Sequence, residues 1–247
     1  MQRIDGYLSC LHEVRCKQDE ETIHRFRVAA RNLLAVYPLF PSQARPKRWK
    51  KKIKKRLTAL NRLRDLQVLQ TRIKGHDAIL MMDIMGEMQG WNPARGKQAG
   101  RKLARQLQGS GRTAARMIRH HPDDFVARLR DEWFKVHALL AARLLAANSG
   151  QPKTLHKLRV AYKSFRYLVI FLHDAGELPE LDREEIKYWQ DMMGSIQDRE
   201  VAAVWLADHH LQDAAPTHAL EEESARLRLH FMRRRRRFRQ FIDGIIW

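Results

Sequence analysis

Apolar side chains recur at helical spacing along this chain of 247 residues. Apolar residues three and four apart form one face of an α-helix, and no stretch alternates with the period of two that marks a half-buried strand. Glycine and proline are few and lie in short breaks between the helical stretches. We therefore predict an all-α fold. The predicted helices cover residues 3–37, 46–73, 76–89, 97–119, 123–148, 153–174, 180–209 and 217–243.

An internal repeat relates the two halves of the chain. Residues 22–34, TIHRFRVAARNLL, align with residues 154–166, TLHKLRVAYKSFR. A second pair follows at nearly the same offset, with LNRLRDLQVL at 60–69 against MGSIQDREVA at 193–202. A helical unit that is present twice explains both alignments.

Each copy carries a helix with one apolar and one basic face. At 100° per residue, the basic residues of the second copy fall within about 80° of arc. They are His156, Arg159, Lys163 and Arg166, opposite an apolar stripe of Leu158, Ala161, Phe165, Leu168 and Leu172. The matching residues of the first copy are His24, Arg27 and Arg31. Like charges stacked on one helix face repel, so we expect an external anion to balance them.

Two further helices extend this basic pattern. The helix at 46–73 places Arg48, Lys51, Lys55 and Arg62 opposite an apolar stripe of Trp49, Ile53, Leu57 and Leu60. Its counterpart in the second copy lacks these cations, and we expect His230, Arg234 and Arg237 of the last helix to replace them. Arg234 is predicted to lie within the apolar stripe of that helix, where a buried guanidinium needs a partner.

Composition limits the partners and the compartment. Lysine and arginine give the chain a formal net charge of +19 and a pI near 10.5, so its surface attracts polyanions. Two cysteines make no disulfide framework, which fits a reducing compartment. No apolar run approaches the length of a membrane span, and the first residues lack the apolar core of a signal peptide. We expect a soluble, cytoplasmic protein.

The pattern HxxRVxxxK…RY, followed by GxxxDxxV, resembles the CHAD family, the conserved histidine α-helical domains. The second half supplies it with His156, Arg159 and Tyr167, and then with Asp198 in IQDREVA. The first half repeats it more loosely, with LRDLQVL after the histidine helix. The resemblance extends over essentially the whole chain.

That resemblance implies a fold and a ligand. It implies a single CHAD-like domain over 1–247, made of two four-helix bundles related by a pseudo-twofold axis around a basic central groove. We expect the first bundle at 1–150, with additional length near 75–120, and the second at 151–247. The implied ligand is inorganic polyphosphate, for which phosphate or sulfate can substitute, and the implied location is the cytoplasm, at polyphosphate granules.

Some of these residues also have purely structural interpretations. A basic face is often an ordinary solvated face, and His24 and His156 are also consistent with packing or with helix starts after Thr22 and Thr154. Asp65 and Asp198 are interpreted as bracing residues that pair with arginines of a neighbouring helix, not as catalytic groups.

No cofactor and no metal site are expected. Cys10, His12 and Cys16 lack a fourth ligand, and the cations beside His24 and His156 would repel a metal ion. An enzyme is not expected either, because no nucleophile–base pair, carboxylate cluster or glycine-rich phosphate loop is present. The alternative function is non-specific nucleic-acid binding. Charge allows it, although the basic faces lack interleaved aromatic residues for base stacking.

Overall fold

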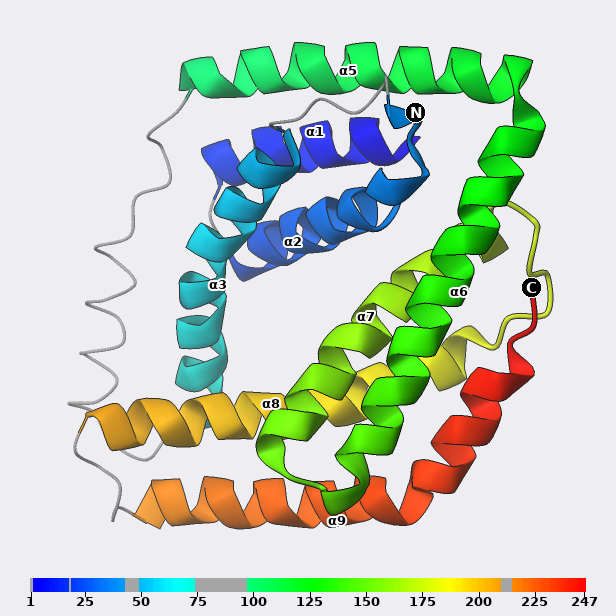
Figure 1. Ribbon diagram of the computed structural model, residues 1–247. Coiled ribbons are helices and arrows are strands. Elements are labelled where there is room, and N and C mark those ends of the chain that lie inside the picture. The colour runs from blue at the N-terminus through cyan, green and yellow to red at the C-terminus, as the bar shows by residue number, and fades with distance from the viewer. Residues whose placement is uncertain (1, 18, 43–48, 74–96, 210–214) are drawn as a thin grey trace. The chain divides into compact units, whose positions relative to one another are not determined.

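The computed structural model describes residues 2–17, 19–42, 49–73, 97–209 and 215–247. These residues form α-helices and short 3₁₀ turns without a strand, so the predicted all-α fold is confirmed (Figure 1). The helices are α1 (Gln2–Cys16), α2 (Glu20–Ala35), α3 (Trp49–Ile73), α5 (Lys97–His120), α6 (Pro122–Ala146), α7 (Pro152–Asp174), α8 (Arg183–Asp208) and α9 (Ala215–Gly244). The 3₁₀ turns are η1 (Tyr37–Leu39) and η3 (Ala147–Ser149). The helix predicted at 76–89 lies outside the described residues.

The single helix predicted at 3–37 is wrong, because α1 and α2 are separate. Asp19 caps α2, and one of its carboxylate oxygens accepts a hydrogen bond from the backbone N–H of Thr22 at 2.7 Å. Lys17 lies 2.6 Å from the other carboxylate oxygen. Together they hold the pKa of Asp19 well below its usual value, the Lys17 ammonium having the larger effect. Thr22 itself is buried within the first turn of α2 instead of starting it.

The chain divides into two compact units. Unit 1 comprises Met1–Gln70 and Asp77–Glu132, and unit 2 comprises Thr71–His76 and Trp133–Trp247. Each unit is described below by itself. Helix α6 contributes residues 122–132 to unit 1 and residues 133–146 to unit 2.

In unit 1, α1 packs against both α2 and α5 (Figure 1). The rings of Tyr7 and Phe26 meet at 5.4 Å between α1 and α2, and both residues are fully buried. Trp49 at the start of α3 packs edge-on against Tyr37 of η1 at 4.6 Å. The apolar stripe predicted for α3, which begins with Trp49 and Ile53, is buried.

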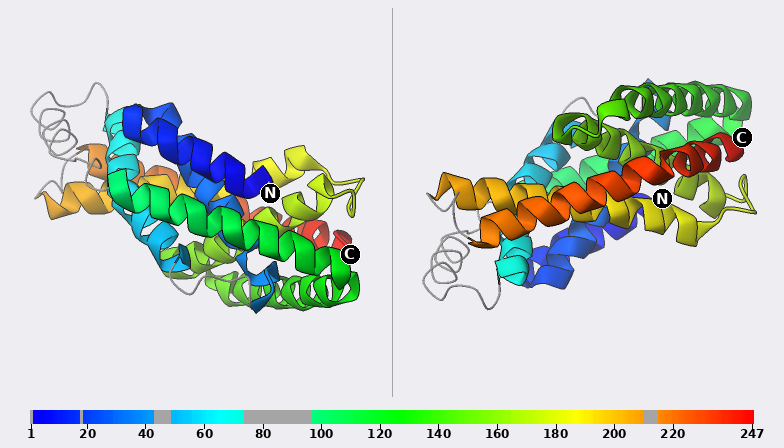
Figure 2. Two further views of the ribbon diagram at one scale, coloured as in Figure 1. Left: turned by 90° about the horizontal axis from the view of Figure 1, so that it is seen from above. Right: turned by 90° about the horizontal axis from the view of Figure 1, so that it is seen from below.

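In unit 2, α8 and α9 lie side by side and run antiparallel (Figures 1 and 2). An aromatic cluster fills the core, with the rings of Trp189 and Phe238 at 4.8 Å and those of Tyr162 and Phe238 at 5.3 Å. The Tyr162 hydroxyl donates a hydrogen bond of 2.9 Å to the carbonyl of Ile186. Burial raises the pKa of Tyr162 far above its usual value, so this phenol stays neutral.

The turn between α6 and α7 packs against α9. Gly150 ends η3 with a φ of 64°, a left-handed conformation that favours glycine. A Cβ atom at Gly150 would lie 3.2 Å from Cγ of Met232. The backbone of this turn therefore packs closely against the middle of α9, just before its run of five arginines, 233–237.

Candidate functional site

Helix α7 presents the basic face that its sequence predicts. Pro152 occupies its first turn, where a missing N–H costs little, and no proline follows within the helix. The predicted apolar stripe, Leu158 to Leu172, is buried. On the other side, His156 is exposed, and the three cations that follow it are partly exposed. These cations are Arg159, Lys163 and Arg166.

A small hollow between α7 and α8 marks the start of this face. It is lined by Leu155, His156, Arg159, Met193, Ile196, Gln197 and Glu200. Nδ1 of His156 forms a hydrogen bond with the amide oxygen of Gln197, which fixes the imidazole ring against α8. The hollow thus places an imidazole, a guanidinium and a carboxylate beside one another.

Arg166 lies at the other end of the α7 face. Its guanidinium carbon is 4.4 Å from the ring centroid of Tyr167, a cation–π contact that orients the side chain. Its Nε atom is buried and has no hydrogen-bond partner within the described part of the chain. A buried donor of this kind is suited to an acceptor from outside.

In unit 1, Arg27 joins the basic face of α2 to α3. Its Nη1 donates to the side-chain oxygen of Asn61 at 2.6 Å and to the carbonyl of Leu60 at 3.2 Å. His24 is exposed and Arg31 is partly exposed. On α3, Lys51 and Lys55 are exposed, while Arg48 and the side chain of Arg62 lie outside what the structure describes.

The prediction for Arg234 is wrong, because this residue is exposed. It lies about 60° from Phe231 on the helix, and its long side chain reaches past the apolar stripe to donate to the hydroxyl of Tyr188. Arg237 is also exposed, and its guanidinium contacts the Glu185 carboxylate at 3.0 Å. Glu185 thereby raises the pKa of Arg237. His230 is exposed.

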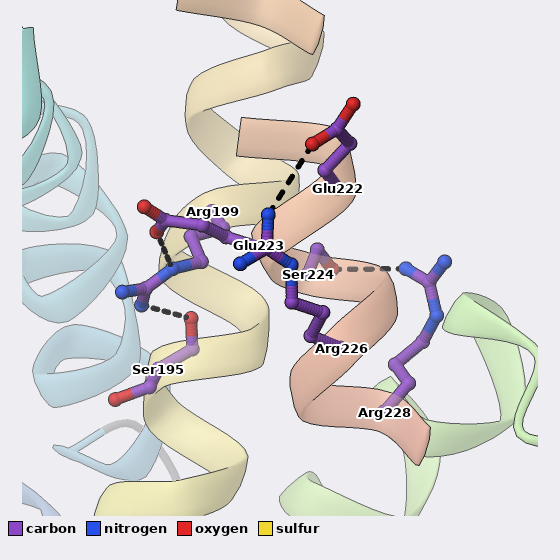
Figure 3. Close-up of polar contacts among 7 residues, drawn as sticks. All are labelled: Ser195, Arg199, Glu222, Glu223, Ser224, Arg226 and Arg228. Atoms are coloured by element: carbon purple, nitrogen blue, oxygen red, sulfur yellow. Dashed lines mark hydrogen bonds and ion pairs between the residues drawn. The ribbon is translucent and has the colours of Figure 1, made fainter. Parts of the chain in front are cut away.

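Helices α8 and α9 are joined by further ion pairs, and Figure 3 shows the one between Arg199 and Glu223. Arg199 contacts Glu223 at 2.5 Å and donates to the carbonyl of Ser195 at 3.1 Å. Arg228 donates to the hydroxyl of Ser224 at 2.9 Å and to Glu200 at 3.3 Å. The side chains of Arg199 and Glu200 are each only 15% exposed, so both pairs are partly shielded from water.

The bracing role predicted for Asp198 belongs instead to the two residues that follow it, Arg199 and Glu200. Within the described residues, Asp198 forms no ion pair, whereas Arg199 and Glu200 connect α8 to α9. The sequence analysis did not identify Glu185 as the partner of Arg237 or Gln197 as the partner of His156. Gln197 could have been found, since it stands beside Asp198 in the repeated stretch, but Glu185 has no such signal. That the two basic faces line one groove stays a prediction.

Comparisons with known proteins agree on the fold. The family model of the CHAD domain matches residues 2–207. A solved structure, the crystal structure of the CHAD domain from the plant Ricinus communis, is similar at 20% sequence identity with a TM-score of 0.61. The match covers 99% of this chain and 89% of that one. No curated protein matches. Within the described residues, no helix is both long and apolar enough to cross a membrane.

Proposed function

The chain belongs to the CHAD domain family, and from this premise we propose that it binds inorganic polyphosphate through the basic faces of α2, α3 and α7. The role is binding without catalysis. Free phosphate or sulfate would occupy the same positions more weakly, because each offers only one anionic group. A location in the cytoplasm at polyphosphate granules follows from this ligand.

The observation that carries the proposal is the basic face of α7. Four cationic or protonatable side chains share one side of a helix whose other side is buried in the core of unit 2. Two of them are oriented by neighbours, His156 by Gln197 and Arg166 by the ring of Tyr167. Groups held in place lose less side-chain entropy when a ligand binds.

Polyphosphate suits such a face because it carries about one negative charge per phosphate unit and offers no base edges. Each charge-assisted hydrogen bond to a phosphate oxygen contributes about 1.5–3 kcal/mol. Several such bonds would give tight binding after the cost of ordering the chain. If about six contacts form, affinity should fall with salt with a log–log slope of about −4 or steeper, by analogy with single-stranded nucleic acids.

Titration with polyphosphate of defined length, beside single-stranded DNA of equal charge at one salt concentration, tests this proposal. We expect polyphosphate to bind at least about tenfold more tightly, a difference of about 1.4 kcal/mol. Replacing Arg159 and Lys163 together by alanine should cost about 3–5 kcal/mol of polyphosphate binding. The control variant R233A/R236A removes the same charge from exposed positions of α9 and should cost under about 1 kcal/mol. Equal losses in the two variants would exclude a defined site.

A further inference from the structure

Helix α5 carries a stripe of arginines that belongs to none of the surfaces above. Arg105, Arg112, Arg116 and Arg119 are all exposed. At 100° per residue they fall within about 60° of arc, and at 1.5 Å per residue they extend over about 21 Å. These four residues are called the α5 stripe below. The opposite side of the helix is buried, with Leu103, Leu107 and Ala114 in the core of unit 1, where α5 packs against α1 (Figure 1).

Among the residues that the structure describes, no acidic side chain pairs with the arginines of the α5 stripe. The sequence of α5 contains no aspartate or glutamate. Within the described part of the chain, none of the four guanidiniums takes part in an ion pair. Four like charges along one line repel each other, and a row of anions outside the protein would relieve that repulsion.

The surroundings of the stripe allow a close approach. Gly109 and Thr113 lie beside the arginines, and the Thr113 hydroxyl is turned back to the carbonyl of Gly109 at 3.1 Å. Apart from the local backbone of α5 and the residues next to Gly109 in the chain, no described atom lies within 4 Å of where a Cβ of Gly109 would be. A rigid backbone could therefore lie along the helix without meeting a large side chain there.

We propose that the α5 stripe is a contact surface for the phosphate backbone of double-stranded nucleic acid. A duplex holds its phosphates in a rigid row, so it pays little ordering entropy on an open surface, whereas a flexible single chain of phosphates would lose more. Arginine is suited to this contact because its planar fork of donors matches phosphate oxygens. The binding is independent of base sequence, since these contacts reach only the backbone.

Two other partners fit the stripe less well. Single-stranded nucleic acid is held largely by base stacking, and α5 has no aromatic residue. A membrane surface is held by an apolar face that enters the lipid, but Leu103 and Leu107 are fully buried in unit 1. The duplex needs neither stacking nor insertion.

Salt dependence of duplex binding tests the proposal through the number of phosphate contacts. Binding of the full chain to a DNA duplex of about 24 base pairs is measured over a range of salt concentrations. Each phosphate contact contributes about −0.9 to the log–log slope, so R112A/R116A should make the slope shallower by about 2. The matched control R233A/R236A should leave the slope nearly unchanged. Both variants replace exposed helical arginines by alanine, and equal urea midpoints will show that both are folded.

Polyphosphate titration of the same variants separates this proposal from the function proposed above. R112A/R116A should change polyphosphate affinity less than about threefold, and R159A/K163A should leave the duplex slope nearly unchanged. An unchanged duplex slope in R112A/R116A would overturn the proposal. So would an equal change in R233A/R236A, which indicates diffuse attraction, or an equal loss of polyphosphate and duplex binding in R112A/R116A.

Discussion

Helices α5 and α9 are both long and rich in arginine, yet their arginines have different surroundings. On α9, Arg228 and Arg237 contact carboxylates of α8, and Arg235 donates to the carbonyls of Leu144 and Leu145 at 2.8 and 3.4 Å. On α5, the four arginines of the α5 stripe face water. The run of five arginines in α9 is the most basic segment of the sequence, but much of its charge serves the fold.

This difference shows that the number of cations on a helix does not determine the charge that it presents. The acidic side chains of the neighbouring helix determine how much of that charge is neutralised. Helix α8 places Glu185 and Glu200 opposite α9, so these arginines are partly neutralised. Helix α5 packs against α1, with Leu103 and Leu107 buried, and the arginines of the α5 stripe form no ion pair within the described residues. The comparison predicts how substitutions in the two helices should differ.

The largest effects should be alike in the two helices, because each buries an apolar stripe. Phe238→Ala in α9 should reduce the free energy of unfolding by about 3–5 kcal/mol and Leu107→Ala in α5 by about 2–5 kcal/mol, as both side chains are fully buried. Urea denaturation measures both, with Leu229→Ala, an exposed position on α9, as the control. A loss below about 1 kcal/mol for L107A would mean that α5 does not pack as described.

The next largest loss of stability should differ between the two helices. Arg228→Ala removes the guanidinium that pairs with Glu200, whose side chain is 15% exposed, and should cost about 1.5–3 kcal/mol of stability. Arg112→Ala in α5 should change stability by less than about 0.5 kcal/mol. Urea denaturation again provides the measurement. Arg226→Ala, which removes an exposed pair with Glu222 on the same helix, is the control and should also cost under about 0.5 kcal/mol. Similar losses for R228A and R112A would remove the distinction between the helices.

A smaller effect should appear within the arginine run itself. Arg235→Ala removes a donor to two carbonyls in the last turn of α6 and should cost about 1–2 kcal/mol, because carbonyls in the last turn of an α-helix lack the usual intrahelical donor. Arg236→Ala, at the adjacent exposed position, should cost under about 0.5 kcal/mol. Thermal unfolding of the two variants, followed by circular dichroism, compares them directly. If R235A and R236A lose the same stability, the arginine run contributes only through its total charge.

The smallest effect is expected at Asp19, a carboxylate that caps the start of α2 and, among the described residues, pairs with Lys17 and not with an arginine. The pKa of Asp19 is lower in the folded chain than in the unfolded chain, so its charge adds stability above the unfolded value of about 3.9, and this contribution is lost as the pH falls below it. Asp19→Asn should therefore destabilise the protein at pH 7, and the difference from the parent should shrink toward pH 3. Urea midpoints across this range test it. Asp131→Asn, at an exposed position, is the control substitution.

Much of the fold could be predicted from the sequence because it depends on local spacing. The periods that bury Leu158 and Ile53 also set the helix boundaries, which the structure reproduces closely for α5 to α9. The division between α1 and α2 was missed because no glycine or proline marks it, although residues 17–22, KQDEET, contain no apolar side chain. The signal was present in Asp19, followed by two glutamates, a typical N-terminal capping pattern.

The partners of the α9 arginines could not be predicted in the same way. The contact between Arg237 and Glu185 joins residues 52 positions apart, and the contact between Arg228 and Glu200 joins residues 28 apart. Such pairs depend on how α8 and α9 are rotated against each other, which no local period determines. For the same reason Arg234 was expected to be buried, whereas its long side chain reaches the edge of the stripe at Tyr188.

The close packing of Met232 against Gly150 has a consequence for insertions and deletions. A run of identical residues does not determine its own rotation in the helix. After a shift by one residue, four of the positions from 233 to 237 would still carry arginine. The register is set from outside the run, by Met232 and Phe231 before it and by Phe238 after it. Loss of one arginine from the run would barely change the composition, yet it would rotate Phe238 by about 100° away from Trp189. The length of the run is therefore more tightly constrained than its charge.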